Sequence, residues 1–240
     1  MNYHWDWGVL FRSPYFVWIL SGFGLTCLIS VLAWGIALVV GSVVGVCRTL
    51  ENRAARAMGT MYVELFRNIP LLVQLFLWFY VVPEVLPTAW GRYLTRGLPY
   101  APFWTTVVGL GLYTAARVAE QVRSGIGAIP RGQREAALAV GFSLPQVYRY
   151  VLLPVGYRTI IPSLTSDFLG VFKNSSLALT LGVLELTATT RQIEDYTFQA
   201  FEPFTAATVL YALVTFTAMG VMRVLEGRGR IAGTLAIGGR

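Results

Sequence analysis

The sequence predicts an all-α integral membrane protein with five transmembrane helices. Of its 240 residues, 55% are hydrophobic and only 13% are charged, and the mean hydropathy is +0.60. No charged residue occurs between Arg12 and Arg48, and this run is longer than the roughly 20 apolar residues that a helix needs to cross the hydrocarbon core. The composition therefore excludes a water-soluble domain with an ordinary charged surface.

We expect residues 1–240 to form a single transmembrane domain whose spans lie at about 16–46, 58–82, 104–122, 160–184 and 204–222. The second span contains Asn68 and Pro70, which predict a kink in that helix. The first span contains small residues that allow helices to approach closely in lipid, so we expect it to pack inside an assembly; they are Gly22, Gly24, Gly35, Gly41 and Gly45.

The distribution of arginine predicts an outer amino terminus and an inner carboxyl terminus, because cytoplasmic connections collect basic residues. With this topology the inner segments hold Arg48, Arg53, Arg56, Arg123, Arg131, Arg134, Arg149, Arg158, Arg223, Arg228, Arg230 and Arg240. The outer segments hold fewer basic residues and more acids, namely Arg12, Arg92, Arg96, Arg191, Asp6, Glu84, Glu185, Glu194, Asp195 and Glu202. Since the inner arginines are spread over separate loops, the net charge of +7 does not indicate a nucleic-acid partner.

The longest inner connection, 123–158, is expected to form two short helices joined by a tight turn. Good helix formers run from Glu135 to Val140, and Gly141 can end that helix. Ser143 and Pro145 then suit the first turn of a second helix. Periodicity alone also allows an amphipathic hairpin that lies on the inner membrane surface.

The loop contains Glu135-Ala136-Ala137, then Gly141, and then Leu153-Pro154. This pattern resembles the signature loop of permease subunits in bacterial ABC importers, with Val151 in place of the isoleucine that is usual there. Segments 64–70, 113–120, 132–133 and 173–177 resemble the polar amino acid branch of type I importers, the histidine/glutamate family. Segments 113–123 and 148–158 look like its glutamate/aspartate permeases, so the resemblance covers nearly the whole chain.

The resemblance implies a multi-pass protein of the bacterial inner membrane whose loop docks on a separate ATPase dimer. The coupling residues would be Glu135, Ala136, Ala137, Gly141 and Pro154. Capping of its own helix is the alternative role of Glu135. The other implied partners are a second permease subunit, identical or different, a periplasmic amino-acid-binding protein, the amino acid substrate and membrane lipid. The chain has no Gly-rich loop followed by Lys and Ser or Thr, so ATP and Mg are expected on the ATPase and no cofactor on this chain.

Ionisable residues within a span are costly and each needs a partner or a function; those in the expected spans are Glu64, Arg67, Arg117, Glu120, Asp167 and Lys173. Arg117 and Glu120 are three residues apart, so they lie on one helix face and can neutralise each other. The same spacing relates Glu64 to Arg67, for which we expect such a pair, with gating at the kink as the alternative. At the place of Arg117 the resembling family commonly has an uncharged residue, often tyrosine.

Arg117 therefore has two interpretations: an ion pair with Glu120, or a contact with the carboxylate of an acidic amino acid in the translocation path. Lys173, Asn174, Ser175 and Ser176 lie in the fourth expected span. Packing is the simplest account of these residues. The resemblance implies that they line the path at the permease dimer interface.

The predicted function is import of a polar amino acid, with glutamate or aspartate favoured and glutamine, histidine or a basic amino acid as alternatives. An ATP-independent secondary transporter is a weaker alternative, because five spans do not divide into two equal halves. An intramembrane enzyme is not expected, since Ser175 and Ser176 have no histidine within any span. His4 is the only histidine and belongs to no ligand cluster, so no metal site is predicted.

Overall fold

The computed structural model describes residues 3–229, and within them every regular element is a helix. In chain order these are η1 (Trp7–Phe11), α1 (Tyr15–Cys47), α2 (Arg53–Asn68), α3 (Leu71–Phe76), η2 (Leu77–Val81), α4 (Val82–Val85), α5 (Thr88–Arg92), η3 (Tyr93–Gly97), α6 (Ala101–Gly127), α7 (Arg131–Ala139), α8 (Leu144–Val147), η4 (Tyr148–Leu152), α9 (Leu153–Asn174), η5 (Ser175–Leu181), α10 (Leu186–Thr197) and α11 (Phe201–Gly229). The all-α prediction is therefore confirmed for the described residues.

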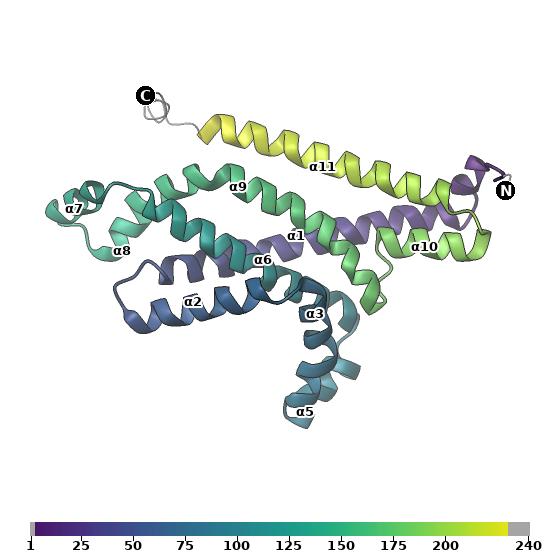
Figure 1. Ribbon diagram of the computed structural model, residues 1–240, viewed down its shortest axis with the longest axis horizontal. Coiled ribbons are helices and arrows are strands. Elements are labelled where there is room, and N and C mark those ends of the chain that lie inside the picture. The colour runs from purple at the N-terminus through teal and green to yellow at the C-terminus, as the bar shows by residue number, and fades with distance from the viewer. Residues whose placement is uncertain (1–2, 230–240) are drawn as a thin grey trace.

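Three of the expected spans, 16–46, 104–122 and 204–222, lie within the long helices α1, α6 and α11 (Figure 1). By length and apolar composition, α1 and residues Phe201–Val224 of α11 can each cross a membrane alone. Two bent helix pairs can supply two further crossings. α6 has 27 residues, which corresponds to about 40 Å of helix.

The second expected span is a broken helix rather than a continuous one. α2 ends at Asn68, and the segment Leu71–Val85 leaves it at an angle of 106°. Pro70 explains the break, because proline has no N–H and disfavours helical geometry at the residue before it. The side-chain amide of the buried Gln74 donates to the carbonyls of Phe66 and Ile69, at 2.7 and 2.8 Å, and so satisfies acceptors that the break leaves open.

The fourth expected span, 160–184, also differs from the helices that the structure shows. α9 begins at Leu153, continues through η5, and is followed after Gly182 by α10, which is bent by 50° from the preceding helix. Gly182 has a φ of +82°, a left-handed conformation that glycine adopts at little cost. α10 occupies much of what we expected to be an outer connection.

The amino end of α10 is held by Glu185, which is fully buried. Its carboxylate accepts hydrogen bonds from the backbone N–H groups of Thr187 and Ala188, at 3.0 and 2.8 Å. It also accepts from the hydroxyls of Thr26 on α1 and Tyr211 on α11, at 3.3 and 2.9 Å. Glu185 therefore joins three helices instead of lying in an outer loop.

α6 packs against α1, α2, α3 and α9 and forms the centre of the bundle (Figure 1). The contact with α1 depends on glycine, since an added Cβ at Gly41 would lie 2.6 Å from the Cβ of Val118. One at Gly45 would lie 2.7 Å from that of Val122. The expectation of close packing is correct for these two glycines and for Gly22, but within the described residues nothing lies within 4 Å of a Cβ at Gly24 or Gly35.

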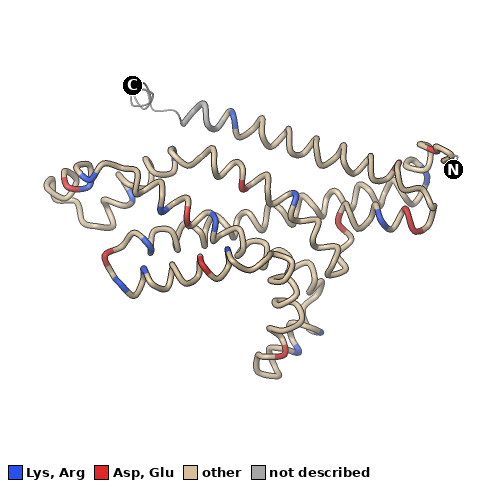
Figure 2. Tube along the Cα trace, in the orientation of Figure 1, with Lys and Arg blue, Asp and Glu red and all other residues tan. Residues whose placement is uncertain are grey.

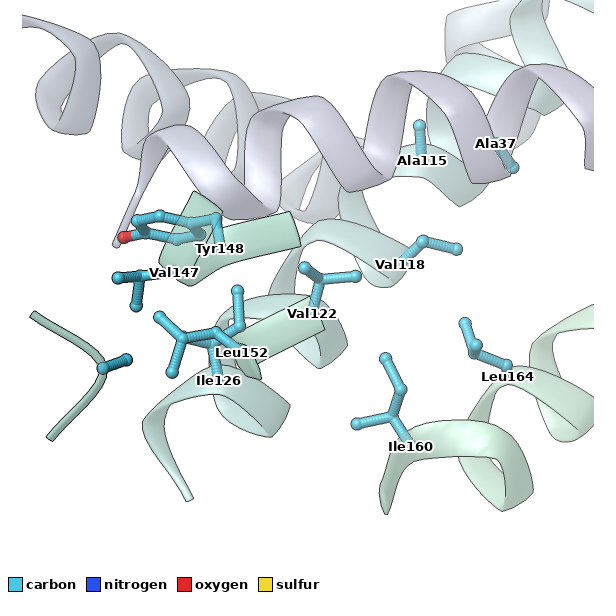
Figure 3. Packing of buried hydrophobic residues seen from close by; sticks show 11 residues of the cluster. Ala37, Ala115, Val118, Val122, Ile126, Val147, Tyr148, Leu152, Ile160 and Leu164 are labelled. Carbon is cyan, nitrogen blue, oxygen red and sulfur yellow. The ribbon is translucent and has the colours of Figure 1, made fainter. Parts of the chain in front are cut away.

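One apolar cluster connects the predicted coupling loop to the long helices (Figure 3). The loop contributes Ala137, Val147 and Leu152, and the helices contribute residues such as Val122 of α6 and Ile160 of α9. All of these side chains are buried. Because close-packed interiors transmit displacement, a movement of α7 and α8 reaches the bundle through this cluster.

The two ends of the bundle differ in charge (Figure 2). The start of α2, α7 and α8 lie at one end, where arginines predominate, and the amino terminus and α10 lie at the other. That second end carries Arg12 and Arg191 together with the acids Asp6, Glu185, Glu194, Asp195 and Glu202. Arg230 and Arg240, which the predicted topology assigns to the inside, lie outside the described residues.

Candidate functional site

A polar cavity of about 370 Å³ lies where the end of α2 approaches α6. It is lined by Arg67, Tyr113, Arg117, Glu120 and Gln121. The four residues from α6 share one face, because they are separated by three or four positions. Arg67, Arg117 and Glu120 are recognisable in the sequence as charged residues within spans. Tyr113 and Gln121 were not predicted as site residues, although their four-residue spacing from Arg117 could have revealed them.

Arg117 pairs with Asp167 of α9, not with Glu120. Its Nε lies 2.7 Å from Oδ1 of Asp167, and the other carboxylate oxygen accepts a hydrogen bond from the amide of Gln121. The side chain of Asp167 is 4% exposed, whereas that of Arg117 is 54% exposed. The buried carboxylate of Asp167 thus holds Nε of Arg117. The two terminal nitrogens of Arg117 have no hydrogen-bond partner among residues 3–229.

Of the two interpretations of Arg117, the ion pair with Glu120 is therefore wrong, and the reason is that Glu120 has other partners. Its carboxylate contacts Arg48 at the end of α1 and Arg123 one turn further along α6. The two arginines neutralise Glu120, and the contact with Arg48 joins the end of α1 to α6 next to the cavity. Arg123, which is also three residues from Glu120, forms the ion pair that this spacing suggested for Arg117.

The expected pair of Glu64 and Arg67 is also absent: in the described part of the chain neither forms an ion pair. Both side chains are exposed, and Arg67 lies on the wall of the cavity. Arg67 and Arg117 thus present two guanidinium groups to one space.

Lys173 and Ser176 do not line this cavity. They line another, of about 480 Å³, with Thr187, Tyr211 and Thr215 of α10 and α11 among its walls. Ser175 is buried, and its hydroxyl donates to the carbonyl of Phe172 at 2.8 Å. Asn174 is the last residue of α9. The structure therefore separates Lys173, Asn174, Ser175 and Ser176 from the pocket of Arg117.

The predicted helix, turn and helix of the inner loop are confirmed. α7 ends just before Gly141, whose φ is +91°, and the N–H of Phe142 donates to the carbonyl of Ala137 at 3.1 Å. Ser143 begins α8, and its N–H and hydroxyl both donate to the side-chain oxygen of Gln146, at 2.8 and 2.9 Å. The turn is therefore fixed by local hydrogen bonds.

Glu135 does not cap α7, because it lies in the middle of a helix whose N-cap is Pro130. Its side chain is exposed and has no hydrogen bond or ion pair within residues 3–229. Ala136 and Pro154 are exposed as well, while Ala137 is buried in the apolar cluster of Figure 3. The capping alternative for Glu135 is thus wrong.

Large apolar side chains surround this turn and remain exposed. They are Leu138, Val140, Phe142, Leu144 and Tyr150, with exposures of 37% to 75%. Such a patch, next to an unpaired carboxylate, is typical of a protein-binding surface.

Comparison with known proteins now decides the family. Residues 37–231 match the model of the family described as "Binding-protein-dependent transport system inner membrane component". The chain belongs to this family. It is the membrane subunit of an ABC importer, a transport component rather than an enzyme, and its class works with an ATPase and a substrate-binding protein.

Relatives within the family transport several amino acids. The chain is 45% identical to the glutamate/aspartate import permease protein GltJ of Escherichia coli K12, over 98% of this chain and 99% of that one. It is 30% identical to the glutamine transport system permease protein GlnP of the same organism, over 94% and 98%. It is also 30% identical to the arginine transport system permease protein ArtQ of Bacillus subtilis 168, over 89% and 94%.

Solved structures support the permease fold. A crystal structure of an amino acid ABC transporter with histidines matches with a TM-score of 0.78 at 26% identity, over 94% of this chain and 100% of that chain. An inward-facing structure of the methionine transporter MetNI matches with a TM-score of 0.76 at 20% identity, over 92% and 100%, and supports the fold alone. The resemblance drawn from the motifs is therefore confirmed for both family and fold.

Proposed function

We propose that the chain is the permease subunit of an ATP-driven importer of glutamate and aspartate, and that the cavity at Arg117 receives the substrate. The observation that carries the proposal is the orientation of Arg117. Asp167 holds its Nε, while the outer edge of the guanidinium has no partner among residues 3–229 and lines the cavity. Such an edge can bind a carboxylate with two parallel hydrogen bonds.

The charge of the cavity favours an anionic ligand over a basic one. Glu120 pairs with Arg48 and Arg123, and Asp167 pairs with Arg117, so the unbalanced charge at the wall comes from Arg67. A basic amino acid would meet the guanidinium groups of Arg67 and Arg117 here, whereas an acidic amino acid brings two carboxylates. The cavity volume of about 370 Å³ also suits a small molecule. The 45% identity to a glutamate/aspartate permease supports the same substrate class.

We further propose that α1, the bent segment α2 to α4, α6, α9 with η5, and α11 form five crossings. The amino terminus is outside and the carboxyl terminus inside. This assignment is supported by the concentration of arginines at the end that carries α7 and α8 (Figure 2). α6 can carry charged groups within the membrane because other helices cover it.

The loop 123–158 is proposed to dock on the ATPase dimer. Glu135 and Ala136 are exposed on α7, Gly141 leaves the turn free of a side chain, and the exposed apolar residues around it supply contact area. ATP and Mg belong to the partner. When the ATPase closes, the displacement of α7 would pass through Ala137 and Leu152 into α6 and α9.

The remaining partners follow from the exposed surfaces. One face of α1 is apolar and uncovered, and it includes Val17, Leu28, Val31, Gly35 and Val39. We assign it to lipid or to the second permease subunit, identical or different. The end that carries the amino terminus and α10 would meet the periplasmic binding protein. Lys173 to Ser176 would line the path outside the Arg117 cavity.

Uptake measurements test the substrate assignment. The complete transporter is reconstituted in proteoliposomes, and ATP-dependent uptake of labelled glutamate is competed with aspartate, glutamine, histidine and arginine. We expect aspartate to compete best, and Arg117→Ala to reduce glutamate uptake at least tenfold through its apparent affinity. Arg96→Ala is the matched control, since it removes an exposed arginine of η3 outside the cavity. Unchanged glutamate uptake by Arg117→Ala would contradict the proposal.

A further inference from the structure

Arg67 is the second arginine that lines the cavity. It lies in the last turn of α2, directly before the break at Asn68 to Pro70, and its side chain is exposed. Within residues 3–229 it forms no ion pair, although Glu64 is one turn away. It reaches the cavity from α2, whereas the other wall residues come from α6.

Two guanidinium groups that face one small cavity are costly unless an anion lies between them. The acids nearby cannot serve both, because Glu120 is held by Arg48 and Arg123, and Asp167 is held by Arg117. Among residues 3–229, each arginine still has N–H groups without a partner in a planar fork, the geometry that carboxylates accept. Arg67 therefore lacks an anionic partner among these residues, whereas Arg117 has Asp167 at Nε and unpartnered terminal nitrogens.

The two arginines differ in how firmly they are held. Asp167 fixes Arg117, and Gln121 fixes Asp167 in turn, so the Arg117 fork is preorganised and can discriminate between ligand ends. Arg67 has no such support in the described residues and can adjust to a group that every ligand shares. In an amino acid the shared group is the α-carboxylate.

We propose that Arg67 binds the α-carboxylate of the substrate, while Arg117 binds the side-chain carboxylate. This inference rests on the proposed function, because it assumes that an acidic amino acid occupies the cavity. It assigns to the bend between α2 and α3 a role in binding. The ligand then bridges α2 and α6.

Ligands that lack one carboxylate at a time test the assignment. Binding is measured on the complete permease and ATPase complex in lipid nanodiscs, without the binding protein, for glutamate, for 4-aminobutyrate, which lacks the α-carboxylate, and for glutamine, which lacks the side-chain charge. We expect Arg67→Gln to weaken the binding of glutamate and of glutamine by about 10- to 100-fold and to leave the affinity for 4-aminobutyrate unchanged. We expect Arg117→Gln to weaken the binding of glutamate and of 4-aminobutyrate and to leave the affinity for glutamine unchanged.

Arg53→Gln is the matched control, because it removes one charge from the other end of α2, about 20 Å away along the helix. Arg67→Lys provides a second variant that keeps the charge and removes the fork, and it should lose part of the glutamate affinity. The role of Arg67 would be overturned if Arg67→Gln weakened the binding of all three ligands equally, if it gave the pattern expected for Arg117→Gln, or if it had no effect. None of these results would contradict the proposal that the transporter imports glutamate with ATP. If the wild-type complex binds no acidic amino acid, both the inference and the proposed substrate are wrong.

Discussion

The substitution Gly41→Ala tests most directly how closely α1 packs against α6. A Cβ at this position would lie 2.6 Å from the Cβ of Val118 and 2.7 Å from the backbone oxygen of Ala115. Carbon atoms pack best at about 3.5 to 4.0 Å, so Gly41→Ala forces a separation of about 1 Å. Neither contact atom can rotate away, because one is a Cβ and the other belongs to the backbone.

The expected cost follows from this geometry. Overpacking by a methyl group costs about 1 to 3 kcal/mol. Replacement of glycine by alanine in a helix otherwise gains about 1 kcal/mol from lower backbone entropy. At Gly35, where no atom of the described residues lies within 4 Å of an added Cβ, only the gain applies. Gly35→Ala is therefore expected to be neutral or stabilising, and Gly41→Ala destabilising by up to about 2 kcal/mol.

Thermal unfolding of the purified chain in detergent measures the difference. We expect a lower midpoint for Gly41→Ala than for the wild type, and a midpoint for Gly35→Ala that is equal or higher. Equal midpoints for the two variants would contradict the packing of α1 against α6. Since α6 carries the cavity, that result would also remove the basis of the site.

Three further substitutions test other parts of the account. Glu185→Ala leaves the N–H groups at the start of α10 without acceptors and should lower stability by about 1 to 3 kcal/mol in thermal unfolding; an unchanged midpoint would refute its role. Asp167→Asn keeps the shape of the side chain but removes the negative charge that holds Arg117, so the apparent KM for glutamate uptake should rise. An unaltered KM would refute the positioning of Arg117 by Asp167. Gly141→Ala must adopt a φ of +91° at a cost of about 1 to 2 kcal/mol and should weaken the stimulation of ATPase activity by substrate; full stimulation would refute the need for this turn.

Local patterns predicted the elements that depend on local chemistry. Hydropathy predicted α1, α6 and α11, and turn residues predicted the break near Pro70 and the turn at Gly141. Hydropathy could not give the angle of 106° at the break, because that angle depends on how α3 packs against α6. The long-range arrangement is set by packing, which no local pattern records.

Ion pairs show the same limit. Arg117 has an acid three residues away, yet it pairs with Asp167, which is 50 positions distant in the chain. Glu185 looked like an outer-loop acid and is a buried helix cap. In both cases the partner comes from another helix, so sequence spacing supplies candidates and the tertiary structure selects among them.

We propose that a partner ATPase drives glutamate import through α7. The most direct measurement is glutamate uptake into proteoliposomes that contain the complete transporter, with and without ATP, for the wild type, Glu135→Ala and the control Glu84→Ala, which removes an exposed acid of α4. The account predicts uptake that requires ATP, is lost largely in Glu135→Ala and is retained in Glu84→Ala. Uptake that proceeds without ATP, or that Glu135→Ala leaves unchanged, would contradict it.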